Sequence, residues 1–160
     1  MEGKTIIRCS WIGNAVFAVT AIPAALGVDA FDPVSAIAAL ALFAVSLVVW
    51  VWAFGAAVAR STRGDNIVVG NLFLFEGRVP KGIRAQLFSS FGVCLLITAL
   101  TASADPFGVL VPMLPLGLIG LWGARHGVFG PRPGFEPEIR PLRPERPARK
   151  RRTTSGGAGE

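Results

Sequence analysis

The chain has 160 residues, of which 52% are apolar and 16% are charged, and its formal net charge is +6. A typical soluble domain has about 25% charged residues, so this composition is typical of a membrane protein, and it excludes a wholly disordered basic chain. Two Cys and one His exclude a disulfide-stapled scaffold and a metal site built from several such side chains.

Four uncharged stretches are each long enough to cross a bilayer as a helix. They lack Asp, Glu, Lys and Arg, and they cover residues 11–28, 34–59, 85–104 and 107–124. About 17–25 apolar residues span the hydrocarbon core as a helix, and inside lipid the backbone must satisfy its own hydrogen bonds. The sequence therefore predicts an all-α integral membrane domain over residues 1–130, with four transmembrane helices as two helical hairpins.

Two other interpretations of these stretches remain open. A buried four-helix bundle in water would need polar outer faces, which the stretches lack. Lys4 and Arg8 before the first stretch also resemble the start of a signal peptide, with Val28-Asp29-Ala30 as a poor cleavage motif. Because 18 uncharged residues are long for a signal peptide, we expect the first stretch to remain as a transmembrane helix.

Basic residues are unevenly distributed among the loops. Two precede the first stretch, five lie between the second and third, and nine follow the fourth, whereas the other two loops hold only the acids Asp29, Asp32 and Asp105. Cytoplasmic loops of membrane proteins collect Lys and Arg. This rule predicts a multi-pass protein of the bacterial inner (cell) membrane with both termini in the cytoplasm. The four Trp lie toward the predicted cytoplasmic ends, where indole N–H groups can stay hydrated.

Each of the two acidic loops ends in Asp-Pro, at residues 32–33 and 105–106. Asp is a strong N-cap, and Pro suits the first position of a helix. We therefore expect Asp32 and Asp105 to cap the helices that follow, with an outer cation site as the alternative. Pro112 and Pro115 predict an irregular outer half of the fourth span, because each removes a helical hydrogen bond.

The third stretch carries polar side chains three or four residues apart, which places them on one face of a helix. They are Gln86, Ser90, Cys94, Thr98 and Thr101. Asn14 lies on a comparable face of the first stretch, among small residues. Small and polar residues mediate helix packing in lipid, so a packing face is expected. A polar path through the membrane is the alternative, although no Asp, Glu, Lys or Arg lies inside a stretch.

The connection between the second and third stretches is apolar at its centre, where two apolar runs flank Gly70-Asn71. This pattern is typical of a β-hairpin. Because both faces of such a hairpin would be apolar, we expect the segment to lie at the membrane interface. The alternative is a docking patch for another membrane protein around Leu72, Phe73 and Phe75.

Residues 131–160 form a tail with 12 of the 26 charged residues and 6 of the 12 Pro, so we expect it to be disordered. Its basic residues recur every third position and end in a basic run: Arg140, Arg143, Arg146, Arg149, Lys150, Arg151 and Arg152. A polyproline II helix has three residues per turn, so the first four would share one edge. Anionic headgroups attract such clusters by about 1 kcal/mol per residue, which predicts contact with anionic lipid rather than nucleic acid.

Three features are shared with one group of bacterial membrane proteins: the segment Trp122–Gly127, the two Asp-Pro turns and the ratio of 13 Arg to 3 Lys. In these features the chain resembles small uncharacterised four-span membrane proteins of high-GC Gram-positive bacteria, a resemblance that implies no site residues.

Motifs for phosphate binding or nucleophilic catalysis are missing, so we expect no enzyme, no catalytic residue and no cofactor. Small residues on helix faces, above all the glycines of the fourth stretch, and the apolar connection favour a non-enzymatic accessory subunit that packs against a larger membrane complex. The alternative is a small oligomeric transporter or lipid-binding membrane protein.

Overall fold

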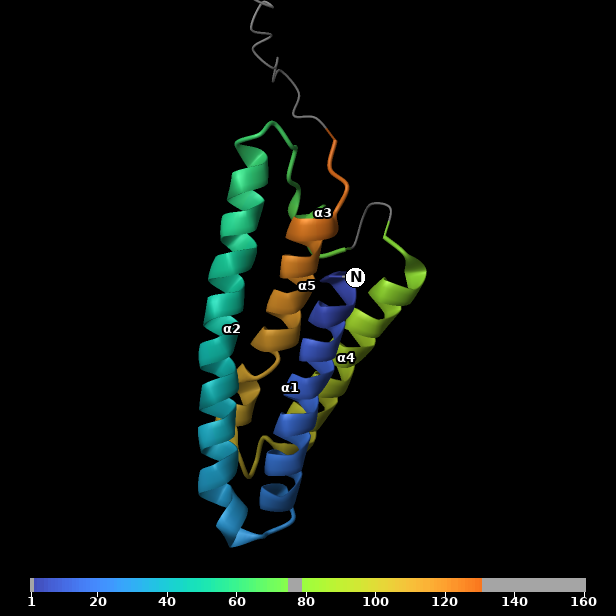
Figure 1. The fold of residues 1–160 in the computed structure, drawn as a ribbon. Helices are drawn as coiled ribbons and strands as arrows, with labels where there is room; N and C mark the ends of the chain where they lie inside the picture. Colours follow the sequence, from blue (N-terminus) through green and yellow to red (C-terminus); the bar gives the residue numbers. More distant parts are fainter. Residues whose placement is uncertain (1, 75–78, 131–160) are drawn as a thin grey trace, which may run out of the picture.

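The computed structural model describes residues 2–74 and 79–130, and every regular element in these ranges is a helix. The main helices are α1 (Glu2–Ala25), α2 (Asp32–Ser61), α4 (Lys81–Thr101) and α5 (Met113–His126). Short helical turns lie in the connections: η1 (Asp29–Phe31), α3 (Val69–Leu72) and η2 (Pro106–Leu110). Figure 1 shows the main helices side by side in one elongated bundle.

Four segments are long and apolar enough to cross a membrane, which confirms the predicted all-α fold with four candidate spans. They cover Gly3–Ala25, Asp29–Ser61, Gly82–Thr101 and Pro106–His126. The helices extend beyond the uncharged stretches, above all at the start of α1, where Lys4 and Arg8 are helical. A charged side chain is unfavourable in hydrocarbon but compatible with a helix. The uncharged stretch therefore marks only the part of each helix that would cross lipid, and the helix itself can be longer.

The closest packing joins helices of different hairpins. α2 packs most extensively on α5, and α1 packs most extensively on α4, whereas contacts within each predicted hairpin are fewer. α5 lies at the centre, since 67% of its span is buried, against 17% for the span of α2. The two hairpins are therefore interleaved, and neither has a core of its own.

The two Asp-Pro turns differ from each other, so the capping prediction holds for only one of them. Asp105 caps η2, because its Oδ1 accepts a hydrogen bond of 3.0 Å from the backbone N–H of Phe107. Asp32 is instead the first residue of α2, whose N-cap Phe31 has no side-chain cap. The irregular start of the fourth span is confirmed, since η2 precedes a regular helix that begins only at Met113.

The predicted β-hairpin at Gly70-Asn71 is wrong, because residues 69–72 form the helical turn α3. This turn lies directly on α5, where a Cβ added to Gly123 would collide with the carbonyl oxygen of Leu72. Glycine at position 123 therefore allows the two backbones to touch. Apolar side chains of the connection then pack against the bundle, and a hairpin with two apolar faces is not needed.

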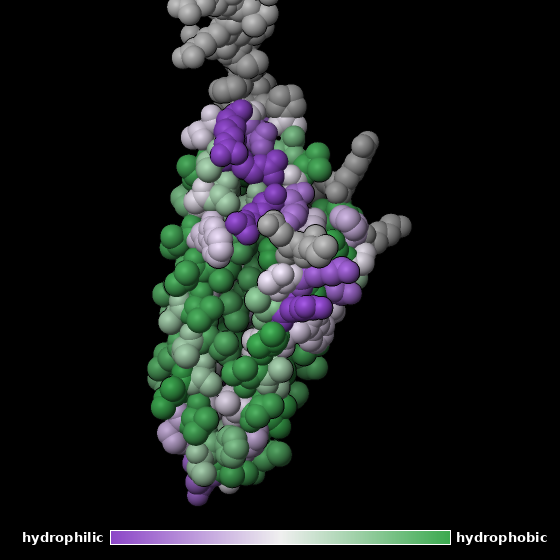
Figure 2. Space-filling model, viewed as in Figure 1, coloured by the Kyte–Doolittle hydropathy of each residue, from purple (hydrophilic) through white to green (hydrophobic). Residues whose placement is uncertain are grey.

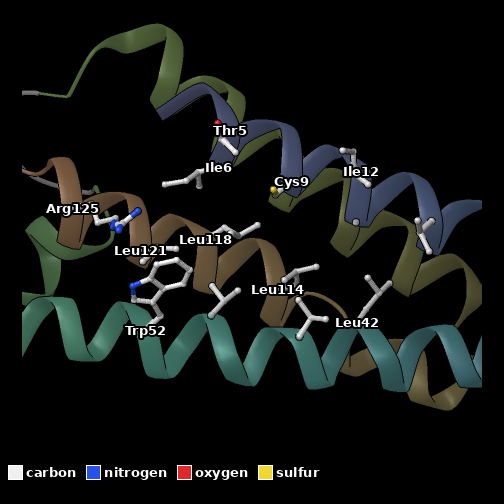
Figure 3. A pocket seen from close by; sticks show the side chains of 14 residues that line it. Thr5, Ile6, Cys9, Ile12, Leu42, Trp52, Leu114, Leu118, Leu121 and Arg125 are labelled. Carbon is white, nitrogen blue, oxygen red and sulfur yellow. The ribbon is translucent and has the colours of Figure 1, made fainter. Parts of the chain in front are cut away.

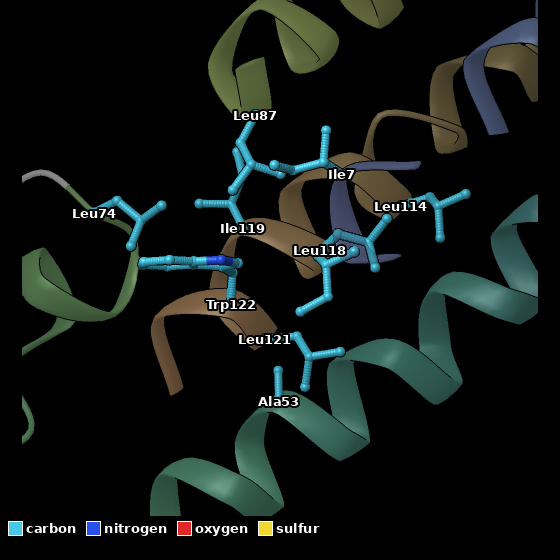
Figure 4. Packing of buried hydrophobic residues seen from close by; sticks show 10 residues of the cluster. Ile7, Ala53, Leu74, Leu87, Leu114, Leu118, Ile119, Leu121 and Trp122 are labelled. Atoms are coloured by element: carbon cyan, nitrogen blue, oxygen red, sulfur yellow. The ribbon is translucent and has the colours of Figure 1, made fainter. Parts of the chain in front are cut away.

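The larger hydrophobic cluster lies at the end of the bundle that carries α3. Figure 4 shows Ile7, Leu87, Ile119 and Leu74 around the ring of Trp122. Trp122 is 4% exposed, and its Nε1 has no hydrogen-bond partner among the described residues. The expectation of a hydrated interfacial indole is therefore wrong for Trp122, because α1, α4 and the α3 connection close over this end of α5.

The surface divides along the bundle axis. In Figure 2, apolar residues cover most of the length of the visible face, and hydrophilic residues gather near the end where α1 begins and α5 ends. The start of α1 and the end of α5 lie together there, since Gly3 is next to Trp122. The connection after α2 is held to the segment that follows α5 by a 2.8 Å hydrogen bond from the N–H of Asn66 to the carbonyl of Gly130. An apolar band with a polar end is the surface expected of a protein embedded in lipid.

Candidate functional site

The predicted polar face of α4 meets α1 in a buried hydrogen-bonded cluster. The Asn14 amide donates to the carbonyl oxygen of Ser90 at 2.7 Å and to its Oγ at 2.9 Å. The hydroxyls of Ser10 and Ser90 are 2.7 Å apart. Ser10, Asn14 and Ser90 are all at most 3% exposed, so this cluster joins two helices inside the bundle and is closed to a ligand from outside.

The rest of the polar face is also used for packing, with one exception. Cys94 and Thr101 are buried, and the Thr98 hydroxyl is 3.4 Å from the carbonyl oxygen of Gly108. Gln86 is exposed, and Leu87 occupies the buried position in that turn. The prediction of a shared face is wrong for Gln86, because the buried side of α4 at this end is set by the apolar cluster around Trp122.

A largely apolar groove of about 510 Å³ runs between α1, α2 and α5. In Figure 3, α5 forms its floor, and side chains of α1 and α2 line its two walls. The volume falls in the range of about 300–1,000 Å³ that is typical of small-ligand sites. The wall residues are Thr5, Ile6, Cys9, Ile12, Gly13 and Val16 from α1, and Leu42, Val45, Val49 and Trp52 from α2.

The length of the groove follows from the helices that line it. Its lining runs from residue 5 to 16 on α1, from 42 to 52 on α2 and from 114 to 125 on α5. At 1.5 Å per helical residue, these segments are each about 15–17 Å long. That is half of the ~30 Å hydrocarbon core of a bilayer, so the groove has the depth of a single leaflet. Ile12, Val45 and Trp52 are each more than half exposed, so the groove opens sideways.

The polar groups of the groove gather at the end where α5 finishes. Arg125 lies there, with its guanidinium carbon 4.8 Å from the centre of the Trp52 ring. On α1, Thr5 lies toward the same end and Cys9 lies nearer the middle of the groove, and both are exposed. The opposite end, around Val16 and Leu42, is apolar. The groove thus has a cationic mouth and an apolar interior.

A second arginine at this end has a structural role. The Arg60 Nε donates to Asp65 at 2.7 Å, and its Nη1 donates to the carbonyl oxygens of Ala124 and Gly127 at 3.2 and 2.8 Å. Its guanidinium also lies 4.6 Å from the centre of the Phe129 ring. Arg60 therefore supplies the donors that the last carbonyls of α5 lack within the helix.

The loop residues proposed for docking turn toward the bundle. Phe73 is half-buried and faces Gly120 and the ring of Trp50, whose centre is 5.9 Å from that of Phe73. Leu74 is fully buried, and Leu72 is half-buried against α5. Phe75 and the tail residues from Arg140 to Arg152 lie outside the described residues.

Sequence reasoning missed the groove, although it noted Trp52 and Arg125 as interfacial side chains. One local signal was present: Thr5, Cys9 and Gly13 recur every four residues and so leave one face of α1 shallow. The facing walls are not visible in the sequence, because they depend on how α1 and α2 splay over α5. In the described part of the chain, no group of three His, Cys, Asp or Glu could hold a metal ion.

Comparison of the chain with family models, with curated proteins and with solved structures found no match. The groove and the side chains at its mouth are therefore the basis for assigning a function.

Proposed function

We propose that the protein is a non-enzymatic lipid-binding membrane protein that holds an acyl chain in the groove between α1, α2 and α5. The observation that carries this proposal is the match between the groove and a lipid tail. The groove is apolar, opens sideways and has the depth of one leaflet. Bulk lipid packs poorly against a concave surface. An acyl chain that enters the groove contacts protein on three sides and so gains van der Waals contacts.

The structure weakens the two observations that favoured an accessory subunit. The small residues of α5 are used inside the molecule: Gly117 admits the Trp50 ring, and Gly123 admits the α3 backbone. The apolar connection also turns inward through Phe73 and Leu74. Neither feature remains free for a partner in the described residues, whereas the groove does.

Lipid retention after gentle purification tests the proposal. Native mass spectrometry of the full chain, released from mild detergent, should detect one bound phospholipid on the wild type. Val45→Trp places a larger side chain in the groove wall, so it should remove the bound lipid. Val48→Trp is the matched control, because Val48 is three residues later on α2, is 66% exposed and lies outside the groove. Equal lipid retention by both variants would contradict the proposal.

The native cysteines provide a second, independent measurement. Cys9 is exposed and lines the groove, whereas Cys94 is buried between helices. Adding phospholipid to delipidated protein should slow the reaction of Cys9 with N-ethylmaleimide. Cys94 should react only on unfolding, with or without lipid, and so reports whether the bundle is intact. If lipid leaves the rate at Cys9 unchanged, the groove is not the binding site.

An accessory subunit remains the second candidate, on one observation. Gly55 and Ala59 are exposed on α2 four residues apart, the small-xxx-small spacing that brings transmembrane helices together. Co-purification from native membranes tests this candidate. A stoichiometric membrane partner that Gly55→Leu displaces would support it, and an unchanged, partner-free protein would count against it.

A further inference from the structure

We infer that the groove selects lipids with an anionic phosphate headgroup, and that Arg125 is the residue that recognises the phosphate. This inference rests on the proposed function, since it concerns the headgroup of the lipid whose chain lies in the groove. It adds Arg125 as a binding residue and anionic phospholipid as the ligand class, and it does not involve the basic tail.

The geometry leaves the hydrogen-bonding edge of Arg125 free. Its guanidinium carbon lies over the Trp52 ring, 4.8 Å from the ring centre, which is a cation–π contact. The N–H groups of a guanidinium lie in its plane and point outward. Arg125 is exposed, and it has no hydrogen bond or ion pair with any described residue. Trp52 thus holds the Arg125 guanidinium in place, and its N–H donors have no acceptor among the described residues.

The usual structural roles of such an arginine are already taken. An arginine in the last turn of a helix commonly donates to the final carbonyls. Here Arg60 makes those bonds, to Ala124 and Gly127. Asp65, the acid in the described part of the α2 connection, is paired with Arg60 as well. Arg125 is therefore not needed to cap α5 or to neutralise Asp65.

The position of Arg125 matches the layout of a phospholipid. Arg125 ends the groove, and Leu121, Leu118 and Leu114 follow it along the floor, one helical turn apart. A phosphate at Arg125 therefore places the attached acyl chain over these leucines, as Figure 3 allows the reader to trace. Guanidinium and phosphate form two parallel hydrogen bonds. In an anionic phospholipid the phosphate keeps its full negative charge for this contact, whereas in a zwitterionic one the headgroup cation offsets it, so the anionic lipid should be preferred. On the orientation expected from the basic residues, this mouth faces the cytoplasmic leaflet.

The selectivity can be measured with two lipids that differ only in the headgroup. The full chain is exchanged into mixed micelles with equimolar phosphatidylglycerol and phosphatidylcholine that carry identical acyl chains, and the bound lipid is read by native mass spectrometry. We expect the wild type to prefer phosphatidylglycerol by about fivefold, which corresponds to about 1 kcal/mol for one basic residue near the surface. Arg125→Gln should lose this preference while it still retains one lipid, and Arg125→Lys should restore part of it.

Arg84→Gln is the matched control. Arg84 lies at the same end of the bundle, above the Phe88 ring at 6.0 Å, but outside the groove, and its loss removes the same charge. It should leave the preference intact. An equal loss in Arg125→Gln and Arg84→Gln would overturn the inference, because the selectivity would then come from overall charge. Equal binding of both lipids by the wild type would also overturn the inference about the headgroup, but it would leave the proposed lipid-binding function standing. No bound lipid at all would instead refute the proposed groove.

Discussion

Among single residues, Asn14 joins α1 to α4 inside the bundle through its side-chain amide. Its amide makes two bonds to Ser90, at 2.7 and 2.9 Å, in a site that is 3% exposed. Polar contacts between transmembrane helices contribute about 0.6–2 kcal/mol, so Asn14→Ala should lower the free energy of unfolding in mixed micelles by about 1 kcal/mol. In Thr20→Ala, the control, the lost bonds are within α1 itself, and stability should be unchanged. Similar values for both variants would show that the cluster does not join the helices.

Helical periodicity correctly predicted most of the buried polar face of α4. Spacing alone identified Ser90, Cys94, Thr98 and Thr101 as one face of α4, and the structure buries all four. It failed at Gln86, because an apolar residue one position later, Leu87, gains more from the cluster around Trp122. Position on a helical wheel gives the direction of a side chain, and neighbouring helices decide which direction is buried.

At the scale of elements, the end of α5 depends on Arg60. The guanidinium joins α2, Asp65 and two α5 carbonyls, so its loss leaves those carbonyls without donors. Arg60→Gln should speed amide hydrogen exchange at Asn66 and Gly127, whose N–H groups bond to Gly130 and Gly123. Arg63→Gln removes an exposed charge three residues later and should leave exchange unchanged. Unaltered exchange in Arg60→Gln would show that α5 ends without this support.

The contact between α3 and α5 depends on one missing Cβ. Gly123→Ala places a methyl group onto the Leu72 carbonyl, a rigid backbone atom, so α3 must move away. Overpacking of this kind costs about 1–3 kcal/mol, which a thermal unfolding scan in detergent should report as a lower Tm. Gly92→Ala on α4 has no atom within 4 Å of its new Cβ and should keep or raise the Tm. If both variants unfold at the same temperature, α3 does not contribute to stability.

For the whole molecule, the distribution of basic residues predicts the orientation in the membrane. Single cysteines at Ala30 and Ser103, introduced after both native Cys are replaced, lie in exposed turns at the end opposite Arg125. An impermeant thiol reagent should label them in intact cells, whereas a cysteine at Thr62 should react only after the membrane is permeabilised. Labelling at Thr62 from outside would invert the topology and move the groove mouth to the other leaflet.

The sequence by itself determined the four apolar helices, because crossing lipid requires a long uncharged stretch and allows few alternatives for the backbone. It also determined the irregular start of the fourth span through Pro112 and Pro115, and it indicated the helix-packing role of Ser90 and its neighbours. Only the tertiary structure decided that α2 pairs with α5 and α1 with α4, and that the apolar connection folds inward. The groove likewise exists only where three helices diverge. The spacing of Thr5, Cys9 and Gly13 marks one shallow face of α1, but the facing residues of α2 are apolar side chains that no local pattern distinguishes from lipid-facing ones.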